Sequence, residues 1–334
     1  MKNPIEVSKL GIKFKTLFRI FVFMKNKILS ICIPTFNRPK VLKKNILSMI
    51  EELKKFSIPI FISDESNNNE TEILITEIKK IYKYIFYFKQ IKKLGHDKNV
   101  FHSLSLPKTE YIWLLSDSVF VNKNAIENVL NIINAHKPDL IAVNSHLREL
   151  DIKKNFYTNA SHVLNDLGWH LTWTGATIYS KNVISSSNKI DKTKYTNFPQ
   201  IALIFTHLSG GCNFYWENNN LISSTKKDKS YWSENIFNVW LEDWRMALNN
   251  LPSCYAKSIK EKVFLEHSIK TGLFNIKSLL NLRSLGILNI NTFRKYNKLL
   301  GIHSGKGTIV MWLILLIPKN LLLILKKIIK RVNY

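Results

Sequence analysis

Three apolar runs of this chain each end in polar side chains that could bind a nucleotide. Residues 34–38 read Pro-Thr-Phe-Asn-Arg, residues 63–66 read Ser-Asp-Glu-Ser, and residues 116–118 read Ser-Asp-Ser. A carboxylate such as Asp64 can accept the imide proton of a base, and a second one such as Asp117 can hold a divalent cation against a diphosphate. Each Asp alone could equally cap a turn or a helix. Their recurrence at three successive run ends favours a ligand site.

The elements that carry these residues alternate between buried strands and amphipathic helices. The predicted strands are 28–34, 58–64, 84–88, 111–117 and 139–145, and the predicted helices include 42–53, 125–133 and one that begins after Asn69. Such alternation is typical of an α/β fold with a mostly parallel sheet covered by helices on both faces. Ligands of such sheets bind at the carboxyl ends of the strands, which is where the three polar clusters lie.

The helix after Asn69 has a start signal and an expected inner face. Asn69, with Glu72 three residues later, resembles a capping box. The residues expected to pack on the sheet are Ile73, Leu74, Ile78 and Ile81. Beyond about residue 215 the pattern becomes helical and less regular. The aromatic residues spaced along one side of a helix there are Trp232, Phe237, Trp240 and Trp244.

Positive charge is concentrated at the two ends of the chain. The formal net charge is +25, of which residues 1–27 carry +6. The residues after Glu266 carry +12, because twelve Lys/Arg and no carboxylate follow it. A basic end can bind nucleic acid or an anionic membrane surface, and the residues beside the charges distinguish the two partners.

The C-terminal end combines its charge with apolar runs. Residues 309–317 read IVMWLILLI, and residues 321–332 read LLLILKKIIKRV. The residues that share one helical face in the second run are Leu321, Leu325, Ile328 and Val332. Nine apolar residues are too few to span a bilayer, where about 20 are needed. An apolar face edged by Lys/Arg is typical of a helix in the lipid interface, so we expect a peripheral membrane protein rather than a nucleic-acid binder. A buried core helix and a true span are the alternatives.

The N-terminal end and the cysteines indicate the compartment. Residues 1–23 contain the apolar run LFRIFVF, but no small-residue cleavage site follows, so we do not expect a signal peptide. Met24 is an alternative translation start. Cys32, Cys212 and Cys254 are odd in number and widely spaced, which favours a reducing compartment over a disulfide framework or a zinc site. We therefore expect a cytoplasmic protein attached to the inner face of the cell membrane.

Several motifs in this order resemble the family 2 glycosyltransferases of the GT-A fold. They are LSICIPTFNRPKVLKKNI, FISDESNNNE and LGHDKNVFHSLSLPKTEYIWLLSDS, and they lie within residues 27–185. The resemblance is nearest to abequosyltransferase-like sugar transferases of bacterial surface polysaccharides. It implies a GT-A domain, which we place over 27–215. From the charge and helical patterns above, we expect a basic extension (1–26) before this domain, and a helical part (216–303) and a membrane-associating segment (304–334) after it.

The resemblance also implies roles for individual residues. The loop residues Pro34, Thr35 and Asn37 would contact the nucleotide, and Asp64 would bind the base. Asp117 would contact the ribose or a metal ion. Gly95, Asp97 and Asn99 match a Gly-x-Asp-x-Asn motif that leads into the helix before the metal-site strand, and Asp97 and Asn99 count among the donor-binding candidates. The stretch WTGATIYSK (173–181) resembles a later strand on the acceptor side.

The chain departs from the family at the metal site. Asp117-Ser118-Val119 stands where the family has Asp-Asp-Asp or Asp-x-Asp. Asp117 and Ser118 are the candidate ligands of a divalent cation, Mn²⁺ or Mg²⁺, with water and the donor diphosphate completing the shell. Ser118 contributes no charge, so cation affinity should fall. Neutralisation of the diphosphate by Lys/Arg, or loss of activity, are the alternatives.

The catalytic base has three candidates. Inverting transfer requires a carboxylate or His that takes the proton of the acceptor hydroxyl. Asp191, Asp243 and His207, in that order, are the candidates, although Asp243 in LEDWRMAL could belong to the acidic face of a surface helix. Trp169, Trp173 and Trp216 could stack on sugar rings or lie in the core.

These patterns together predict an enzyme. It would transfer one sugar from a nucleotide-diphosphate donor to a hydroxyl of a glycan or lipid-linked acceptor, with inversion expected from the resemblance. The sequence contains no G-x-G-x-x-G or P-loop motif, which argues against dinucleotide and ATP chemistry. The alternative is a non-catalytic basic protein that binds anionic lipid or nucleic acid on a decayed transferase scaffold.

Overall fold

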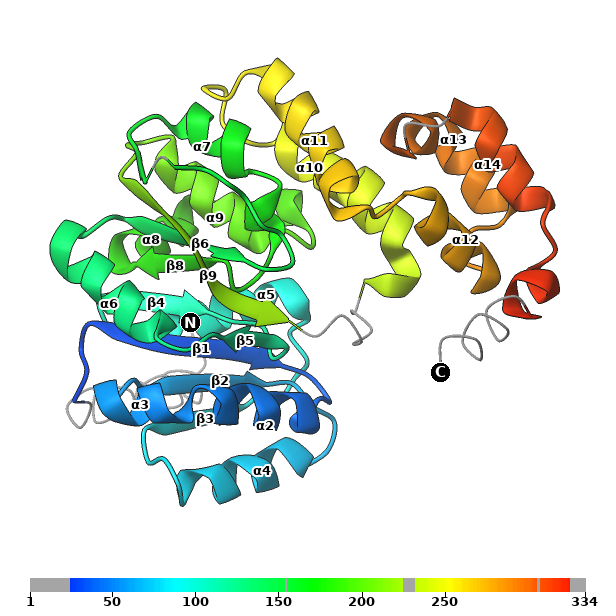
Figure 1. Ribbon diagram of the computed structural model, residues 1–334. Helices are drawn as coiled ribbons and strands as arrows, with labels where there is room; N and C mark the ends of the chain where they lie inside the picture. Colours follow the sequence, from blue (N-terminus) through cyan, green and yellow to red (C-terminus); the bar gives the residue numbers. More distant parts are fainter. Residues whose placement is uncertain (1–24, 154, 225–231, 305–306, 325–334) are drawn as a thin grey trace, which may run out of the picture. The chain divides into compact units, whose positions relative to one another are not determined.

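The structure is a computed structural model that describes residues 25–153, 155–224, 232–304 and 307–324. The chain divides into two compact units. Unit 1 comprises Met1–Val163 and Leu171–Asp228, and unit 2 comprises Leu164–His170 and Lys229–Tyr334. The described part of unit 1 contains the sheet, and that of unit 2 is helical (Figure 1).

Unit 1 is built on a mixed sheet. Its described residues form nine strands in the order β3-β2-β1-β4-β8-β6-β9-β5, with β7 paired to β9. The strands are β1 (Leu29–Thr35), β2 (Ile60–Asp64), β3 (Ile85–Lys89), β4 (Tyr111–Leu114), β5 (Val119–Val121), β6 (Leu140–Ser145), β7 (Phe156–Tyr157), β8 (Thr177–Ser180) and β9 (Phe214–Ser224). β1 to β4 are parallel, and β6 runs in the same direction because β8 is antiparallel to both β4 and β6. Their carboxyl ends therefore share one side, here called the carboxyl edge.

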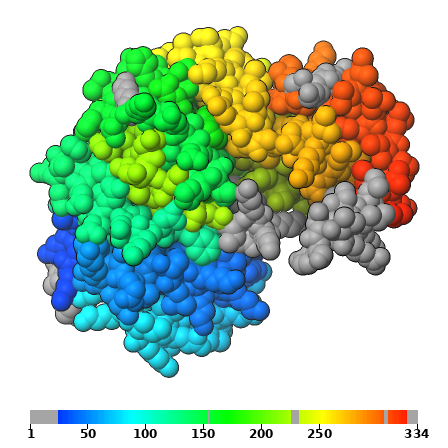
Figure 2. All heavy atoms as spheres, viewed as in Figure 1, coloured from blue at the N-terminus to red at the C-terminus, as the bar shows by residue number. Residues whose placement is uncertain are grey.

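Two groups of helices pack on the sheet. The helices of unit 1 are α2 (Pro39–Ser48), α3 (Ile50–Phe56), α4 (Glu70–Lys79), α5 (His96–Ser105), α6 (Ala125–His136), α8 (Lys181–Ser185) and α9 (Pro199–Leu208), and α7 (Ala160–Leu167) passes into unit 2. α2 contacts α3 and α4, and α3 contacts α6, whereas α9 contacts α5 and α8. The blue helices α2 and α3 lie over β1 and β2 in Figure 1. In Figure 2, the atoms of this blue region cover the sheet on the side facing the viewer.

Burial on both faces explains the apolar strands. Leu29, Ile31 and Ile33 alternate along β1 and pack in one core cluster with Leu42 and Ile46 of α2. The intervening residues of β1 point to the opposite face, as alternation along a strand requires, and are also fully buried up to position 32. A strand covered on both faces reads as a continuous apolar run, and so the predicted α/β class is confirmed.

The structure also corrects several predicted details. The helix predicted over 42–53 is two helices, α2 and α3. The Asn69 side chain makes no capping hydrogen bond, and the Asn68 side chain instead accepts one from the Glu70 N–H. Ile73 and Ile81 are exposed, because the buried face of α4 is turned toward Thr71, Leu74, Ile75 and Ile78. The expected domain boundary after residue 215 falls inside β9, whose residues pair with β5, β6 and β7.

Unit 2 is built from helices around aromatic side chains. A π-helix (Asn238–Asp243) continues into α10 (Trp244–Asn249), followed by α11 (Lys257–Thr271), α12 (Ile276–Ser284), α13 (Ile290–Ser304) and α14 (Gly307–Leu316). The Trp240 ring stacks on His267 with centroids 3.8 Å apart, and Trp244 is fully buried. The expected boundary between 303 and 304 lies within α13.

The C-terminal helices bear on the membrane prediction. No single helix among the described residues is long and apolar enough to span a bilayer, whereas one sharply bent pair, Ile290–Ser304 with Ile309–Leu316, passes the same test of length and composition. The face predicted from Leu325, Ile328 and Val332 lies outside the described residues, as does the basic extension up to residue 24.

Candidate active site

Asp117 lies at the carboxyl edge, just after β4, and is bound from the neighbouring strand β1. Its Oδ1 accepts a hydrogen bond from Arg38 Nη1 at 2.7 Å, and its Oδ2 accepts one from Thr35 Oγ1 at 3.1 Å. Asp117 is 5% exposed, whereas the Arg38 side chain is 30% exposed. β4 ends at Leu114, before the predicted end at 117, so Asp117 lies in the turn that follows the strand. The structure thus brings together two predicted residues, Thr35 and Asp117, and adds Arg38.

The turn that carries Asp117 is held from below by α2. The Asn45 side-chain amide lies 2.6 Å from the Val119 carbonyl oxygen and 3.2 Å from each of the Ser116 and Asp117 carbonyl oxygens. Asn45 is fully buried. One side chain therefore sets the backbone path through the Asp-Ser pair.

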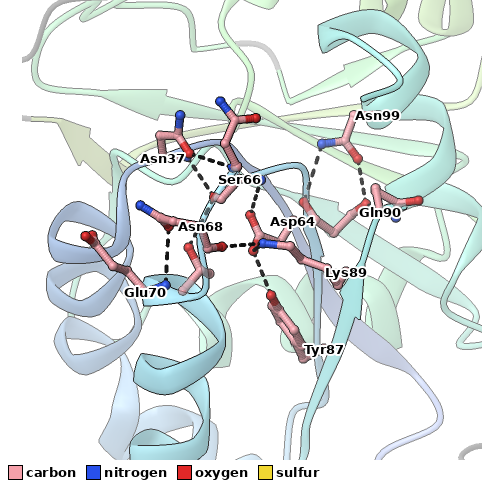
Figure 3. A network of polar contacts seen from close by, with 12 residues as sticks. Asn37, Asp64, Ser66, Asn68, Glu70, Tyr87, Lys89, Gln90 and Asn99 are labelled. Atoms are coloured by element: carbon pink, nitrogen blue, oxygen red, sulfur yellow. Dashed lines mark hydrogen bonds and ion pairs between the residues drawn. The ribbon is translucent and has the colours of Figure 1, made fainter. Parts of the chain in front are cut away.

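The loop after β1 is tied to the loop after β2. Asn37 adopts a positive φ of 53°, which Asn tolerates better than most residues. Its N–H donates to Ser66 Oγ at 2.8 Å, and its Oδ1 accepts from the Asn67 N–H at 3.0 Å. These contacts fix the backbone immediately before Arg38 (Figure 3).

Asp64, the expected base-binding residue, lies at the end of β2 and is fully buried. Its Oδ1 accepts from the Ser66 N–H at 2.8 Å, and its Oδ2 accepts from Tyr87 Oη at 2.7 Å and from Lys89 Nζ at 3.4 Å (Figure 3). Burial and the hydrogen bond to Asp64 raise the pKa of Tyr87, which keeps its phenol protonated as the donor. Asp64 thus joins β2 to β3 at the carboxyl edge.

Asn99 is hydrogen-bonded to Ser63, the residue before Asp64. It lies in α5, is 3% exposed, and its Oδ1 accepts from Ser63 Oγ at 2.5 Å, while its amide donates to the Ser63 carbonyl at 3.4 Å. Gln90 also donates to Ser63 Oγ at 2.9 Å (Figure 3). The Glu65 carboxylate accepts from the N–H groups of Leu94 (2.5 Å) and Gly95 (3.0 Å), whose φ of 83° favours glycine. The predicted Gly-x-Asp-x-Asn motif thus organises the start of α5.

Asp97 and Asp191 are connected through one segment. Asp97, in the first turn of α5, accepts from the Asn197 N–H at 3.0 Å and contacts His96 Nδ1 at 2.8 Å. α5 begins just after the carboxyl end of β3, so the segment 191–198 reaches this side of the sheet. Asp191 is exposed and accepts from both the N–H and the Oγ1 of Thr193, which lowers the pKa of its carboxyl. It is an ionised carboxylate on the accessible surface.

His207 lies at the amino ends of the parallel strands, opposite the carboxyl edge. Its Nε2 is 3.4 Å from Asp139 Oδ2, and Asp139 immediately precedes β6. Through β8, the start of β6 aligns with the start of β4, because Leu140 pairs with Tyr179 and Tyr179 pairs with Ile112. The structure therefore does not bring His207 together with Asp117, which follows the end of β4.

Asp243 belongs to unit 2, at the end of the π-helix. It is 9% exposed and accepts from Asn238 Nδ2 at 3.0 Å, so it does not lie on the surface face that was the alternative for this motif. The neighbouring Glu242 is the more exposed of the two carboxylates, and its Oε1 lies 2.9 Å from Lys295 Nζ. π-helical turns are frequent at functional sites.

Most of the candidate sugar-stacking aromatics lie in the core. Trp169 and Trp216 are buried, whereas Trp173 is half-buried with the Arg148 guanidinium 5.7 Å from its ring centroid. Arg148 Nη1 donates to Thr172 Oγ1 at 2.7 Å, and burial lowers the pKa of Arg148 to about 10, so it stays charged at neutral pH. Arg148 follows β6 and so lies toward the carboxyl edge.

The residues at Asp117 do not fit a protein-held divalent cation well. Such an ion is usually bound by one or two carboxylates with phosphate and water. Here both oxygens of the single carboxylate already accept hydrogen bonds, one of them from a guanidinium. The nearby hydroxyls of Ser116 and Ser118 lie 3.5 Å apart. Within the described parts of the chain, no three His, Cys, Asp or Glu residues are grouped as metal ligands.

Three contributors were missed from the sequence. Arg38 was noted only as part of a loop, and Tyr87 only as part of a strand. Asn45 had a usable signal: it lies three residues after Leu42 and next to Ile46, on the apolar face of its helix. A polar residue on a buried face needs a partner, and that requirement points to the backbone of a neighbouring turn.

Comparisons with known proteins agree with this geometry. The profile of "Glycosyl transferase family 2" matches residues 30–193. The abequosyltransferase RfbV of Salmonella typhimurium is 32% identical over 102 residues, 30% of each chain. The poly(ribitol-phosphate) β-N-acetylglucosaminyltransferase TarP of Staphylococcus aureus is 30% identical over 118 residues, 34% of this chain and 36% of that protein. This chain therefore spans only about a third of either curated relative.

Solved structures share the fold. S. aureus TarS in complex with UDP-GlcNAc superposes with a TM-score of 0.55 at 14% identity, covering 83% of this chain and 80% of that one. The mannosyltransferase PcManGT of Pyrobaculum calidifontis, in complex with GDP-Man and Mn²⁺, gives 0.54 at 8% identity, covering 85% and 86%. The helix-flanked sheet is thus a GT-A-like fold, and residues 30–193 of this chain form a domain of glycosyl transferase family 2.

Proposed function

We propose that this protein transfers one sugar from a nucleotide-diphosphate donor to a hydroxyl of a glycan or lipid-linked acceptor in bacterial surface polysaccharide assembly. The observation that carries the proposal is the convergence of Thr35, Asp64 and Asp117 from three parallel strands at one edge of the sheet. Nucleotides bind at that edge in α/β sheets. The relatives, named for abequosyl and N-acetylglucosaminyl transfer, support a sugar donor.

The residues at this edge have complementary tasks in such a reaction. The loops after β1 and β2 would hold the nucleotide, and the turn with Asp117 would contact the ribose. The acceptor oxygen forms a bond to the anomeric carbon as the bond from that carbon to the β-phosphate oxygen breaks, and its electron pair leaves with the diphosphate. The acceptor proton passes to a base. The protein mainly positions the two reactants and stabilises the leaving diphosphate.

A thermal-shift panel tests the donor part of the proposal. UDP, GDP, CDP and TDP are each added with Mn²⁺ and, separately, with EDTA. A matching nucleotide at about 100 times its Kd should raise the melting temperature by roughly 5 to 10 °C. Asp117→Asn should abolish the shift, whereas Glu51→Gln, which changes an exposed carboxylate of α3, should preserve it. If no nucleotide shifts either condition while an RNA or anionic lipid does, the binding-protein alternative is correct.

Variants in which kcat and donor affinity are measured separately can assign the catalytic base. Asp191 is the exposed candidate of unit 1, six residues before the Asn197 that is bound at the start of α5, and Asp243 is the candidate in unit 2. Replacing the true base by Asn should lower kcat about 100-fold or more with donor affinity unchanged, because general base catalysis contributes about that much. Equal kcat in Asp191→Asn and wild type would exclude Asp191.

The proposal includes attachment to the inner face of the cell membrane through the C-terminal helices. α14 exposes Ile309 (76%), Trp312 (45%), Leu313 (58%) and Leu316 (75%), while its other face buries Met311, Ile314 and Leu315. Contiguous apolar patches on a surface indicate an interaction site. The surrounding sequence after Glu266 carries twelve Lys/Arg and no carboxylate, which suits anionic lipid.

Vesicle sedimentation tests the attachment. The wild type should pellet with vesicles containing anionic phospholipid and much less with neutral ones. The triple variant Ile309→Asn, Leu313→Asn, Leu316→Asn should remain in the supernatant with an unchanged melting temperature, because the buried face of α14 is intact. Wild-type protein that stays in the supernatant, or a triple variant that still pellets, would refute the attachment.

A further inference from the structure

We infer that the Arg38 guanidinium takes the place of the divalent cation at Asp117, so that the donor diphosphate is bound and released without a metal ion. The inference rests on the proposed function and concerns how the same site neutralises the donor. Its basis is the 2.7 Å ion pair between Arg38 Nη1 and Asp117 Oδ1, at the point where the family's second metal-site carboxylate is replaced by Ser118.

The charges at this position suit an arginine better than a divalent ion. With Ser118 neutral, Asp117 is the single carboxylate of the motif, and one guanidinium balances it. A cation that bound Asp117 would have to displace Arg38 or lie beside a positive charge in a site that is 5% exposed. Coulomb repulsion between like charges is strong where water is largely excluded. The pair therefore competes directly with a metal ion.

The geometry also lets Arg38 reach a second anion. A guanidinium has five N–H donors in a planar fork, so one side chain can bind a carboxylate and a phosphate together. The Arg38 side chain is 30% exposed, in contrast to the nearly buried carboxylate behind it. The exposed part of Arg38 is therefore accessible to a second anion at the carboxyl edge, where the proposed diphosphate would lie.

The chain around Arg38 holds it in this orientation. Asn37, directly before it, is fixed by Ser66 and Asn67, and Pro39, directly after it, begins α2. Proline at the first helical position restricts φ and so stiffens this junction. Phe36 in the same loop is packed against Lys93, whose Nζ lies 4.1 Å from the ring centroid. A preorganised cation stabilises a developing anion without the cost of reorganisation.

In the transfer step, Arg38 would act on the leaving group. When the bond between the anomeric carbon and the phosphate oxygen breaks, its electron pair adds negative charge to the β-phosphate, and the guanidinium N–H groups bind that charge. The acceptor oxygen forms the new bond to the anomeric carbon and gives its proton to the base. No oxidant, reductant or metal is needed to balance the step.

Isothermal titration with the nucleoside diphosphate found in the panel tests the inference. For the wild type, affinity in EDTA should equal affinity in Mn²⁺ within about twofold. Arg38→Gln should lose at least about tenfold in EDTA, because it removes charge-assisted hydrogen bonds. In Mn²⁺ the same variant should recover part of that loss, since the Asp117 carboxylate becomes available to the ion. Arg38→Lys keeps the charge but not the planar group of N–H donors, so its nucleotide affinity in EDTA should lie between those of the wild type and Arg38→Gln.

A matched control separates this effect from general charge. Lys44→Ala removes an exposed positive charge on α2, away from Asp117, and should change affinity by less than about twofold. Melting temperatures without ligand show whether each variant is folded.

The outcomes are distinct. If the wild type binds nucleotide at least about tenfold more weakly in EDTA than in Mn²⁺, the ion is required and the inference is wrong, while the transferase proposal stands. Arg38→Gln that binds like the wild type in EDTA also overturns it. If no nucleoside diphosphate binds in either condition, the proposed function itself fails.

Discussion

Replacing Asn45 by Ala should loosen the turn that carries Asp117 without touching any group that contacts the donor. The Asn45 side chain is fully buried in α2, and its amide lies within hydrogen-bond distance of three carbonyl oxygens of residues 116–119. Ala keeps the helix, because it has the highest helix propensity. The change therefore isolates the link between α2 and the turn.

The magnitude follows from the number of bonds that one amide can make. It has two N–H groups, so at most two strong bonds form: the one to Val119 at 2.6 Å, and one shared between the two carbonyls at 3.2 Å. A buried carbonyl left without a donor costs about 1 to 3 kcal/mol. The Asn45 Oδ1 atom is itself buried with no hydrogen-bond partner in this structure, and its removal returns part of that cost. We expect a net loss of about 2 to 3 kcal/mol of unfolding free energy.

Urea unfolding measures the stability, and titration with the bound nucleotide measures the site. Nucleotide affinity should fall about tenfold, because the backbone of Asp117, the ion-pair partner of Arg38, is no longer fixed. Lys44→Ala, on the exposed face of the same helix, should change neither quantity. A loss of less than about 0.5 kcal/mol together with unchanged affinity would show that the turn holds its shape without Asn45.

Three further predictions follow from single contacts. Ser118→Asp should restore a second carboxylate beside Asp117, so Mn²⁺ should bind more tightly, as measured by the Mn²⁺ electron paramagnetic resonance signal; no gain would mean that the metal motif is wrongly aligned. Burial lowers the pKa of His303 to about 4 from its ordinary 6.5, so the unfolded chain gains a proton in this window before the folded one does. Unfolding free energy should then fall by about 3 kcal/mol between pH 7 and pH 4, and urea titrations of His303→Phe should show a correspondingly smaller fall. His207→Gln should leave kcat unchanged in a transfer assay, and a loss of about 100-fold would contradict its placement away from the site.

The sheet could be predicted from the sequence because burial on both faces leaves a strong local signal. β1, β2, β3 and β6 were each expected within two residues of their observed bounds, since continuous apolar runs have few other uses. Three strands, β5, β7 and β9, were not predicted. β9 contains Glu217 and Asn218–Asn220, a polar stretch where its register with β6 shifts, so its sequence does not alternate like a strand.

The candidate site could be predicted only in part, because its contacts join distant segments. The positions of Thr35, Asp64 and Asp117 follow from the rule that parallel strands end at one edge. The partners of those residues do not follow from that rule. Tyr87 and Lys89 meet Asp64 because β3 pairs with β2 in register, and Arg38 meets Asp117 across 79 positions of sequence. Such pairings depend on tertiary structure that no local pattern encodes.

The direction of α9 also distinguishes two candidates for the catalytic base, His207 and Asp191, which residue type alone could not do. α9 begins two residues after Asn197, whose N–H is bound by Asp97 at the start of α5, on the carboxyl side of the sheet. The helix rises about 1.5 Å per residue, so His207 lies about 12 Å further along its axis, where it meets Asp139 at the start of β6. Asp191 lies between two fixed points of the chain: Ser186 contacts His207 Nδ1 at 3.1 Å, and Asn197 is bound at the start of α5. A base must reach the acceptor proton within about 3 Å in the reacting complex. In unit 1, that requirement counts against the imidazole of His207 and leaves Asp191, an exposed carboxylate whose pKa is lowered by its hydrogen bonds to Thr193, as the remaining candidate.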